Sequence, residues 1–64
     1  MSGDALSFGE MAECAERELR LRRRNYPRWV DAGRMTQALA DRETRTMEAM
    51  AEHLRGLAAS ERLL

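Results

Sequence analysis

The 64-residue sequence predicts an all-α protein that forms one domain, residues 1–64. It contains no isoleucine, a single valine, and only one each of Phe, Trp and Tyr, so little in it favours a β-strand. Ala, Leu, Met, Glu and Arg, which are good helix formers, dominate the composition. Apolar residues recur at helical spacing in two long segments, and the only proline and a glycine lie between them.

The first helix is expected over residues 8–24. Ser7 and Glu10 have the spacing of a capping box, in which each side chain satisfies a backbone N–H at the start of a helix. The residues that follow share one helical face, which Arg22 and Tyr26 continue. The apolar members of this face are Phe8, Met11, Ala12, Ala15 and Leu19.

A structured corner is expected over residues 25–35. Pro27 lacks a backbone N–H and disfavours helical geometry at Tyr26, so the first helix is predicted to stop before it. Proline is also suited to the first turn of a helix, which predicts a short helical turn from Pro27 to Ala32. Gly33 fits the left-handed position that ends a helix.

The second helix is expected over residues 36–59, with Thr36 as its N-cap and residues 60–64 frayed. One face of it collects the apolar residues Leu39, Ala40, Met47, Met50, Leu54, Leu57 and Ala58, with Ala51 at the margin. The predicted core consists of Leu19, Tyr26, Leu39, Met47, Met50 and Leu54.

Two helices joined by a short corner predict an antiparallel two-helix hairpin. A hairpin is a single layer of packing, and a chain of this length lacks a self-sufficient core. Each helix would therefore keep an apolar flank exposed to water. A second copy is the simplest cover, so we expect a homodimer that forms a four-helix bundle with two-fold symmetry.

Two charged residues project into the predicted apolar faces. Arg22 falls within that of the first helix, and Glu43 lies between Leu39 and Met47 on the second. In an antiparallel hairpin they are able to meet as a structural ion pair. The alternative is that Glu43 reaches solvent, because long charged side chains extend easily past apolar neighbours.

The segment from Arg17 to Trp29 holds six arginines, and Glu18 is its only acid. One interpretation is a solvated helix face with pairs at i and i+4, such as Glu13–Arg17, Glu16–Arg20 and Glu18–Arg22. A second is docking to an acidic protein surface, with Tyr26 and Trp29 as anchors, although Trp29 also suits a cap over the core. A third is phosphate contact with DNA or RNA, which the zero net charge and the lack of a nucleic-acid-binding motif make less favoured. The candidate partner-binding residues are Arg20, Arg23, Arg24, Arg28 and Trp29.

Other function classes find little support. Cys14 is the only cysteine and His53 the only histidine, so neither an internal disulfide nor a metal site or other cofactor is expected. No nucleophile–base arrangement is visible, and the protein is predicted not to be an enzyme. No apolar run approaches the ~20 residues of a membrane span, and no secretory signal is visible, so we expect a cytoplasmic protein without membrane contact.

The run ELRLRRRNYPRWVDAGRMTQALADRE, residues 18–43, resembles a motif of small uncharacterised proteins of phages and prophages. That pattern is Glu-Leu, paired Arg, Tyr-Pro-Arg, an aliphatic residue or Trp, Val, then Gly, Arg or Lys, Met or Leu, and Ser or Thr, followed by Ala and Glu in the next helix. The matching residues are Glu18, Leu19, Arg22, Arg23, Tyr26, Pro27, Arg28, Val30, Gly33, Arg34, Met35, Thr36, Ala40 and Glu43.

The resemblance implies a mobile-element protein of the bacterial cytoplasm that acts by binding. Small phage proteins of this kind inhibit a host enzyme, block a defence complex such as a CRISPR effector (an anti-CRISPR protein), or assist phage DNA metabolism. The expected function is therefore a protein–protein interaction module, plausibly such an inhibitor, that acts through the arginine-rich surface. The alternative is a nucleic-acid-binding accessory protein that uses the same arginines on phosphates.

Overall fold

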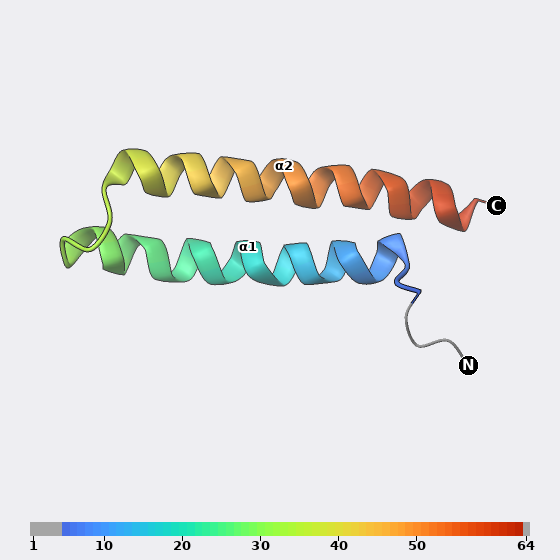
Figure 1. Cartoon of the computed structure of the whole chain (residues 1–64), viewed down its shortest axis with the longest axis horizontal. Helices are drawn as coiled ribbons and strands as arrows, with labels where there is room; N and C mark the ends of the chain where they lie inside the picture. The colour runs from blue at the N-terminus through green and yellow to red at the C-terminus, as the bar shows by residue number, and fades with distance from the viewer. Residues whose placement is uncertain (1–4, 64) are drawn as a thin grey trace.

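The computed structural model describes residues 5–63. Within this range the chain forms two α-helices, α1 (Phe8–Asp31) and α2 (Gln37–Arg62). The helices run antiparallel and lie side by side along their length, joined by a short turn at one end (Figure 1). The predicted all-α hairpin is confirmed.

Local capping signals define where both helices begin. The Ser7 hydroxyl accepts a hydrogen bond from the Glu10 N–H at 3.0 Å, and the Glu10 carboxylate accepts one from the Ser7 N–H at 3.5 Å. The Thr36 hydroxyl accepts from the Leu39 N–H at 3.1 Å. Each bond satisfies a backbone donor that has no partner inside the helix, so the predicted capping box and N-cap are confirmed.

The far end of α2 is more regular than predicted. The sequence suggested fraying from residue 60, but the helix continues to Arg62, and residue 64 lies outside the described range. The Glu61 carboxylate accepts a hydrogen bond from the Phe8 N–H at 3.4 Å. This contact joins the last turn of α2 to the first turn of α1, where a negative charge is favoured by the helix dipole.

The first helix does not stop before Pro27, so the predicted end at residue 24 and the predicted corner at residues 25–35 are wrong. Helix α1 continues through Pro27 to Asp31, and only residues 32–36 form the turn. Pro27 is exposed and removes one backbone hydrogen bond, to the carbonyl of Arg23. Continuing the helix buries Tyr26, seven residues beyond Leu19 and therefore on the same face, and this tertiary contact outweighs the local preference.

The turn between the helices is closed at Gly33. The Gly33 N–H donates to the Val30 carbonyl at 3.0 Å, and the Arg34 N–H donates to the Trp29 carbonyl at 2.8 Å. These two bonds are those of a Schellman motif, which requires a left-handed residue after the helix. Gly33 has a φ of +74°, so the role predicted for this glycine is confirmed.

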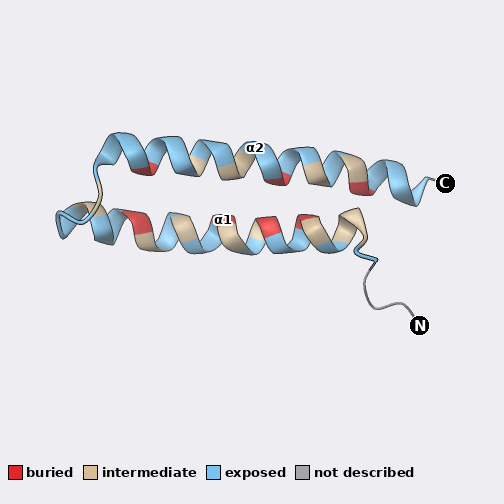
Figure 2. Ribbon diagram, in the orientation of Figure 1, coloured by how far each residue is buried: buried red, intermediate tan, exposed pale blue. Residues whose placement is uncertain are grey.

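The buried residues of the two helices face one another along the hairpin (Figure 2), and most of them are alanines. We call these residues the alanine seam: Ala12, Ala15, Leu19 and Tyr26 on α1 and Ala40, Ala51 and Ala58 on α2. Leu19 and Tyr26 were predicted correctly as core. The larger α2 residues Leu39 and Met50 were not, since 46% and 49% of their surface is exposed. Ala51, placed at the margin by the sequence, is fully buried at the centre, because short side chains let two helices approach closely.

Candidate functional site

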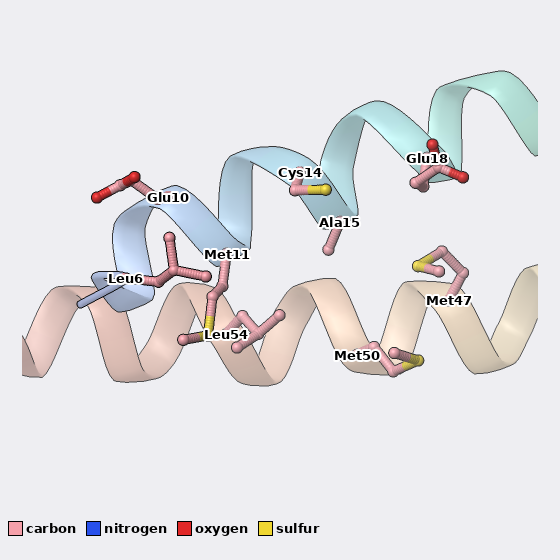
Figure 3. Close-up of a pocket in the computed structure, with 9 residues that line it drawn as sticks. All are labelled: Leu6, Glu10, Met11, Cys14, Ala15, Glu18, Met47, Met50 and Leu54. Carbon is pink, nitrogen blue, oxygen red and sulfur yellow. The ribbon is translucent and has the colours of Figure 1, made fainter. Parts of the chain in front are cut away.

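A shallow apolar groove of about 500 Å³ lies along the half of the hairpin near the two termini. Leu6, Met11 and Leu54 gather at one end of it, and Met47 and Met50 line it from α2 (Figure 3). The remaining lining residues are Glu10, Cys14, Ala15 and Glu18. The volume falls within the range of protein sites that bind a ligand or an inserted side chain.

The exposed apolar surface continues from this groove towards the turn. A second hollow, lined by Leu21 and Trp29, shares Glu18 with the groove. Trp29 lies 18 residues, or five complete helical turns, after Met11, so the two side chains project in the same direction. We call this side of the hairpin the apolar face; Glu18 and Arg22 interrupt it, and its apolar residues are Leu6, Met11, Cys14, Leu21, Trp29, Leu39, Met47, Met50 and Leu54.

Charged residues cover the opposite side of the hairpin. Two ion pairs cross between the helices there, Arg23 with Glu48 and Arg55 with Glu16. On α2, Glu48 and Arg55 project to one side of the buried Ala51, and the methionines of the apolar face project to the other side. The hairpin therefore has one polar side and one apolar side.

Arg22 lies at the middle of the apolar face but does not pair with Glu43 as predicted. Its guanidinium donates to the Glu18 carboxylate at 2.7 Å, one turn earlier on the same helix. This hydrogen bond is the main cause that raises the pKa of Arg22 above its ordinary value. Glu43 is exposed and makes no ion pair with any residue in the 5–63 range. Arg22 pairs with Glu18 and not with Glu43 because an i,i+4 carboxylate reaches it without depending on helix packing.

Four arginines form a separate surface on α1, which we call the arginine stripe: Arg17, Arg20, Arg24 and Arg28. Their spacing of three, four and four residues places them on one helical face, about 16 Å long at 1.5 Å per residue. All four are exposed, and none forms an ion pair with an acid among the described residues.

The predicted partner-binding residues do not form one surface. Arg20, Arg24 and Arg28 lie on the arginine stripe, but Arg23 is held by Glu48 on the polar side of the hairpin. Trp29 is 39% exposed and belongs to the apolar face, with its ring centroid 5.6 Å from that of Tyr26. One helical residue is a rotation of about 100°, so Trp29 points well away from Arg28.

Three further observations concern metal ligands, membrane spans and the cysteine. Across residues 5–63 no group of three His, Cys, Asp or Glu side chains is placed to hold a metal ion. In the same range, neither helix combines the length and apolar character needed to cross a bilayer. Cys14 is a free, exposed thiol at the edge of the apolar groove.

No family model, no curated protein and no solved structure matches this chain. The function is therefore argued from the two surfaces themselves.

Sequence reasoning missed two parts of this arrangement. The cross-helix pairs Arg23–Glu48 and Glu16–Arg55 depend on the register of the two helices, which no local pattern specifies. The split between Trp29 and the arginines was available from the helical projection, once α1 is allowed to continue through Pro27.

Proposed function

We propose that this protein is a protein–protein interaction module that associates with a second copy of itself through the apolar face and presents the arginine stripe to an acidic partner. The observation that carries the proposal is the division of the hairpin into a polar side and an apolar side. Contiguous exposed apolar surface of this kind marks an interaction site in a small protein. The dimer would be the expected four-helix bundle.

The size of the exposed surface supports self-association. The chain has an accessible surface of 5153 Å², whereas a compact monomer of its 7.4 kDa mass is expected to expose about 4,200 Å². A two-helix hairpin has a single layer of packing, so it leaves large side chains such as Met50 and Trp29 open to a partner.

The arginine stripe supports the second half of the proposal. It points away from α2 and borders the apolar face only at Leu21, which lies one turn from Arg17 and Arg24. Most of the stripe therefore stays exposed when a dimer forms through that face. Arginine presents a rigid fork of donors that matches carboxylates, and it is enriched at protein interfaces. An acidic protein surface is therefore the partner that we favour for the stripe, and nucleic acid is the competing one.

Self-association is tested by measuring solution mass for a pair of neighbouring variants. Met50→Asp places a charge in the apolar face, and Ala49→Asp places the same charge on an exposed position of the same helix that projects away from it. We expect Met50→Asp to be monomeric at concentrations where the wild type and Ala49→Asp are dimers. Equal masses for the two variants would contradict the proposal.

The partner class of the stripe is tested by reversing charges at Arg20, Arg24 and Arg28. The proposal is supported if the wild type captures an acidic host protein and the charge-reversed variant does not. Reversal of Arg34 and Arg45 instead is the control, and that variant should still capture the protein. Binding to duplex DNA that weakens steeply with salt would point to phosphates instead, because neutralised phosphates release counterions. The narrower proposal, an inhibitor of a host or defence protein, is supported by the phage-type resemblance of residues 18–43 alone.

A further inference from the structure

We infer that the two copies pack with their turns at opposite ends, so that α1 lies antiparallel to α1 of the second copy and Trp29 of each copy covers Met11 of the other. This inference deepens the proposed dimer and rests on it. It follows from a symmetry of the apolar face that has no role in the packing of a single hairpin.

The ion pairs on the polar side show which residues of α1 and α2 lie at the same height along the hairpin. Glu16 contacts Arg55, and Arg23 contacts Glu48, so the numbers of residues at the same level add to the same total in both pairs. By this register, residue 20 on α1 lies level with Ala51 on α2. We consider a two-fold axis that lies between the two copies and runs perpendicular to the helices at this level. It places each helix over the same helix of the second copy, with the two running in opposite directions.

Apolar residues of α1 are arranged symmetrically about this level. Met11 and Trp29 lie nine residues to either side of residue 20 and project in the same direction. The axis therefore places the exposed Trp29 ring of one copy over the end of the groove lined by Met11 in the other. Aromatic side chains that fill such a hollow dominate the energetics of many interfaces.

The charged residues of the apolar face obey the same symmetry. Glu18 and Arg22 lie two residues to either side of residue 20 and are only partly buried in the single hairpin. The axis places Glu18 of one copy opposite Arg22 of the other, so the two intrahelical pairs combine into a ring of four alternating charges. The charges of α1 that the interface desolvates are then matched, as a stable interface requires, whereas Glu43 on α2 lies opposite Ala59.

Helix α2 repeats the pattern. Met47 and Leu54 lie almost equally far from Ala51, and Met50 is nearly on the axis. Each copy would therefore set Met47 against Leu54 of the other, and the two Met50 side chains would meet. This accounts for the 49% exposure of Met50 in the hairpin.

The other two-fold arrangement, with both turns at the same end, lacks this match. There α1 of one copy lies over α2 of the other, and the register given above sets Leu21 opposite Met50 but Trp29 opposite Arg42 and Met11 opposite Ser60. It also sets Glu18 near His53 and leaves Arg22 without an acid across the interface. The antiparallel arrangement therefore matches the apolar and charged residues of α1 more fully than this one does.

The test is disulfide trapping. In a Cys14→Ser background, Met50→Cys places one thiol per chain next to the proposed axis, and Ala49→Cys places it on the neighbouring residue that projects outwards. Helices packed face to face bring such axial residues within the Cα separation that a disulfide spans. Under a mild oxidant such as diamide, we expect the Met50→Cys variant to form covalent dimer at least ten times faster than the Ala49→Cys variant.

A third variant separates the two arrangements. Leu21→Cys together with Met50→Cys, again with Cys14→Ser, would cross-link between residues 21 and 50 if the turns lay at the same end. Dominant cross-linking between the two residues 50, located by mass spectrometry of the digested dimer, supports the antiparallel arrangement. If the wild type is dimeric by mass but the double-cysteine variant shows mainly 21–50 linkage, or if Met50→Cys and Ala49→Cys cross-link at equal rates, this inference is overturned and the proposed dimer stands. A monomeric wild type overturns both.

Discussion

The alanine seam gives the sharpest prediction about the fold. Ala51 has 0% exposure at the centre of the contact between α1 and α2. Ala51→Leu adds three carbons where no space is free, so the helices must separate or the new side chain must strain. Overpacking of this kind costs about 1–3 kcal/mol. For a domain of this size each kcal/mol lowers the Tm by about 4–8 °C, so a loss near 2 kcal/mol corresponds to about 8–16 °C.

Thermal unfolding followed by circular dichroism, at one fixed protein concentration, measures this effect. The matched control is Ala49→Leu, the same substitution two residues earlier at an exposed position. Leucine and alanine are both good helix formers, so the control is expected to change stability by less than about 0.5 kcal/mol. If Ala51→Leu melts within 2 °C of Ala49→Leu, the close helix–helix contact along the alanines is refuted.

Three further outcomes follow from local geometry. Pro27→Ala is expected to raise stability by about 1–3 kcal/mol in denaturant titrations, because it restores a backbone donor inside α1; a loss would mean that Pro27 shapes the turn. Gly33→Ala is expected to cost about 1 kcal/mol from backbone strain alone, since φ is +74° and no atom lies within 4 Å of the added Cβ; an unchanged midpoint would contradict the left-handed cap. A double-mutant cycle on Arg23 and Glu48 is expected to give a coupling of about 0.2–1 kcal/mol that falls in 1 M salt, and zero coupling at low salt would remove the cross-helix pair.

The parts of the fold that sequence reasoning captured are those specified by neighbouring residues. The capping box at Ser7, the N-cap at Thr36 and the left-handed Gly33 each depend on chemistry within a few positions. The end of α1 was predicted wrongly because Pro27 is a local signal and the burial of Tyr26 against α2 is not. Tertiary contact overrode local preference there.

The core was harder to predict for a related reason. Hydrophobic size ranks Leu39 and Met50 above Ala40 and Ala51, yet the structure buries the alanines and exposes the larger side chains. Which residues lie at the centre depends on the distance and rotation between the helices, and periodicity alone leaves the rotation uncertain by about one residue. The predicted end of α1 before Pro27 placed Trp29 with the arginines, and the pairing of Arg22 with Glu43 overlooked the local carboxylate of Glu18.

The exposure of Leu39, Met50 and Trp29 bears on function, because it leaves large apolar side chains open to a partner. The sequence indicated that an apolar flank would stay open, and the structure gathers that surface on one side, opposite the ion pairs Arg23–Glu48 and Glu16–Arg55. A side chain that a single hairpin does not bury is available to a partner. The arginine stripe meets the apolar face only at Leu21, so most of it stays open to a partner when the apolar face is buried.

Sedimentation equilibrium of the wild-type protein over a range of concentrations tests the central claim most directly. Burial of the apolar face predicts a mass of twice 7.4 kDa at micromolar concentration, with dissociation on dilution. A mass of 7.4 kDa that persists up to millimolar concentration would contradict it.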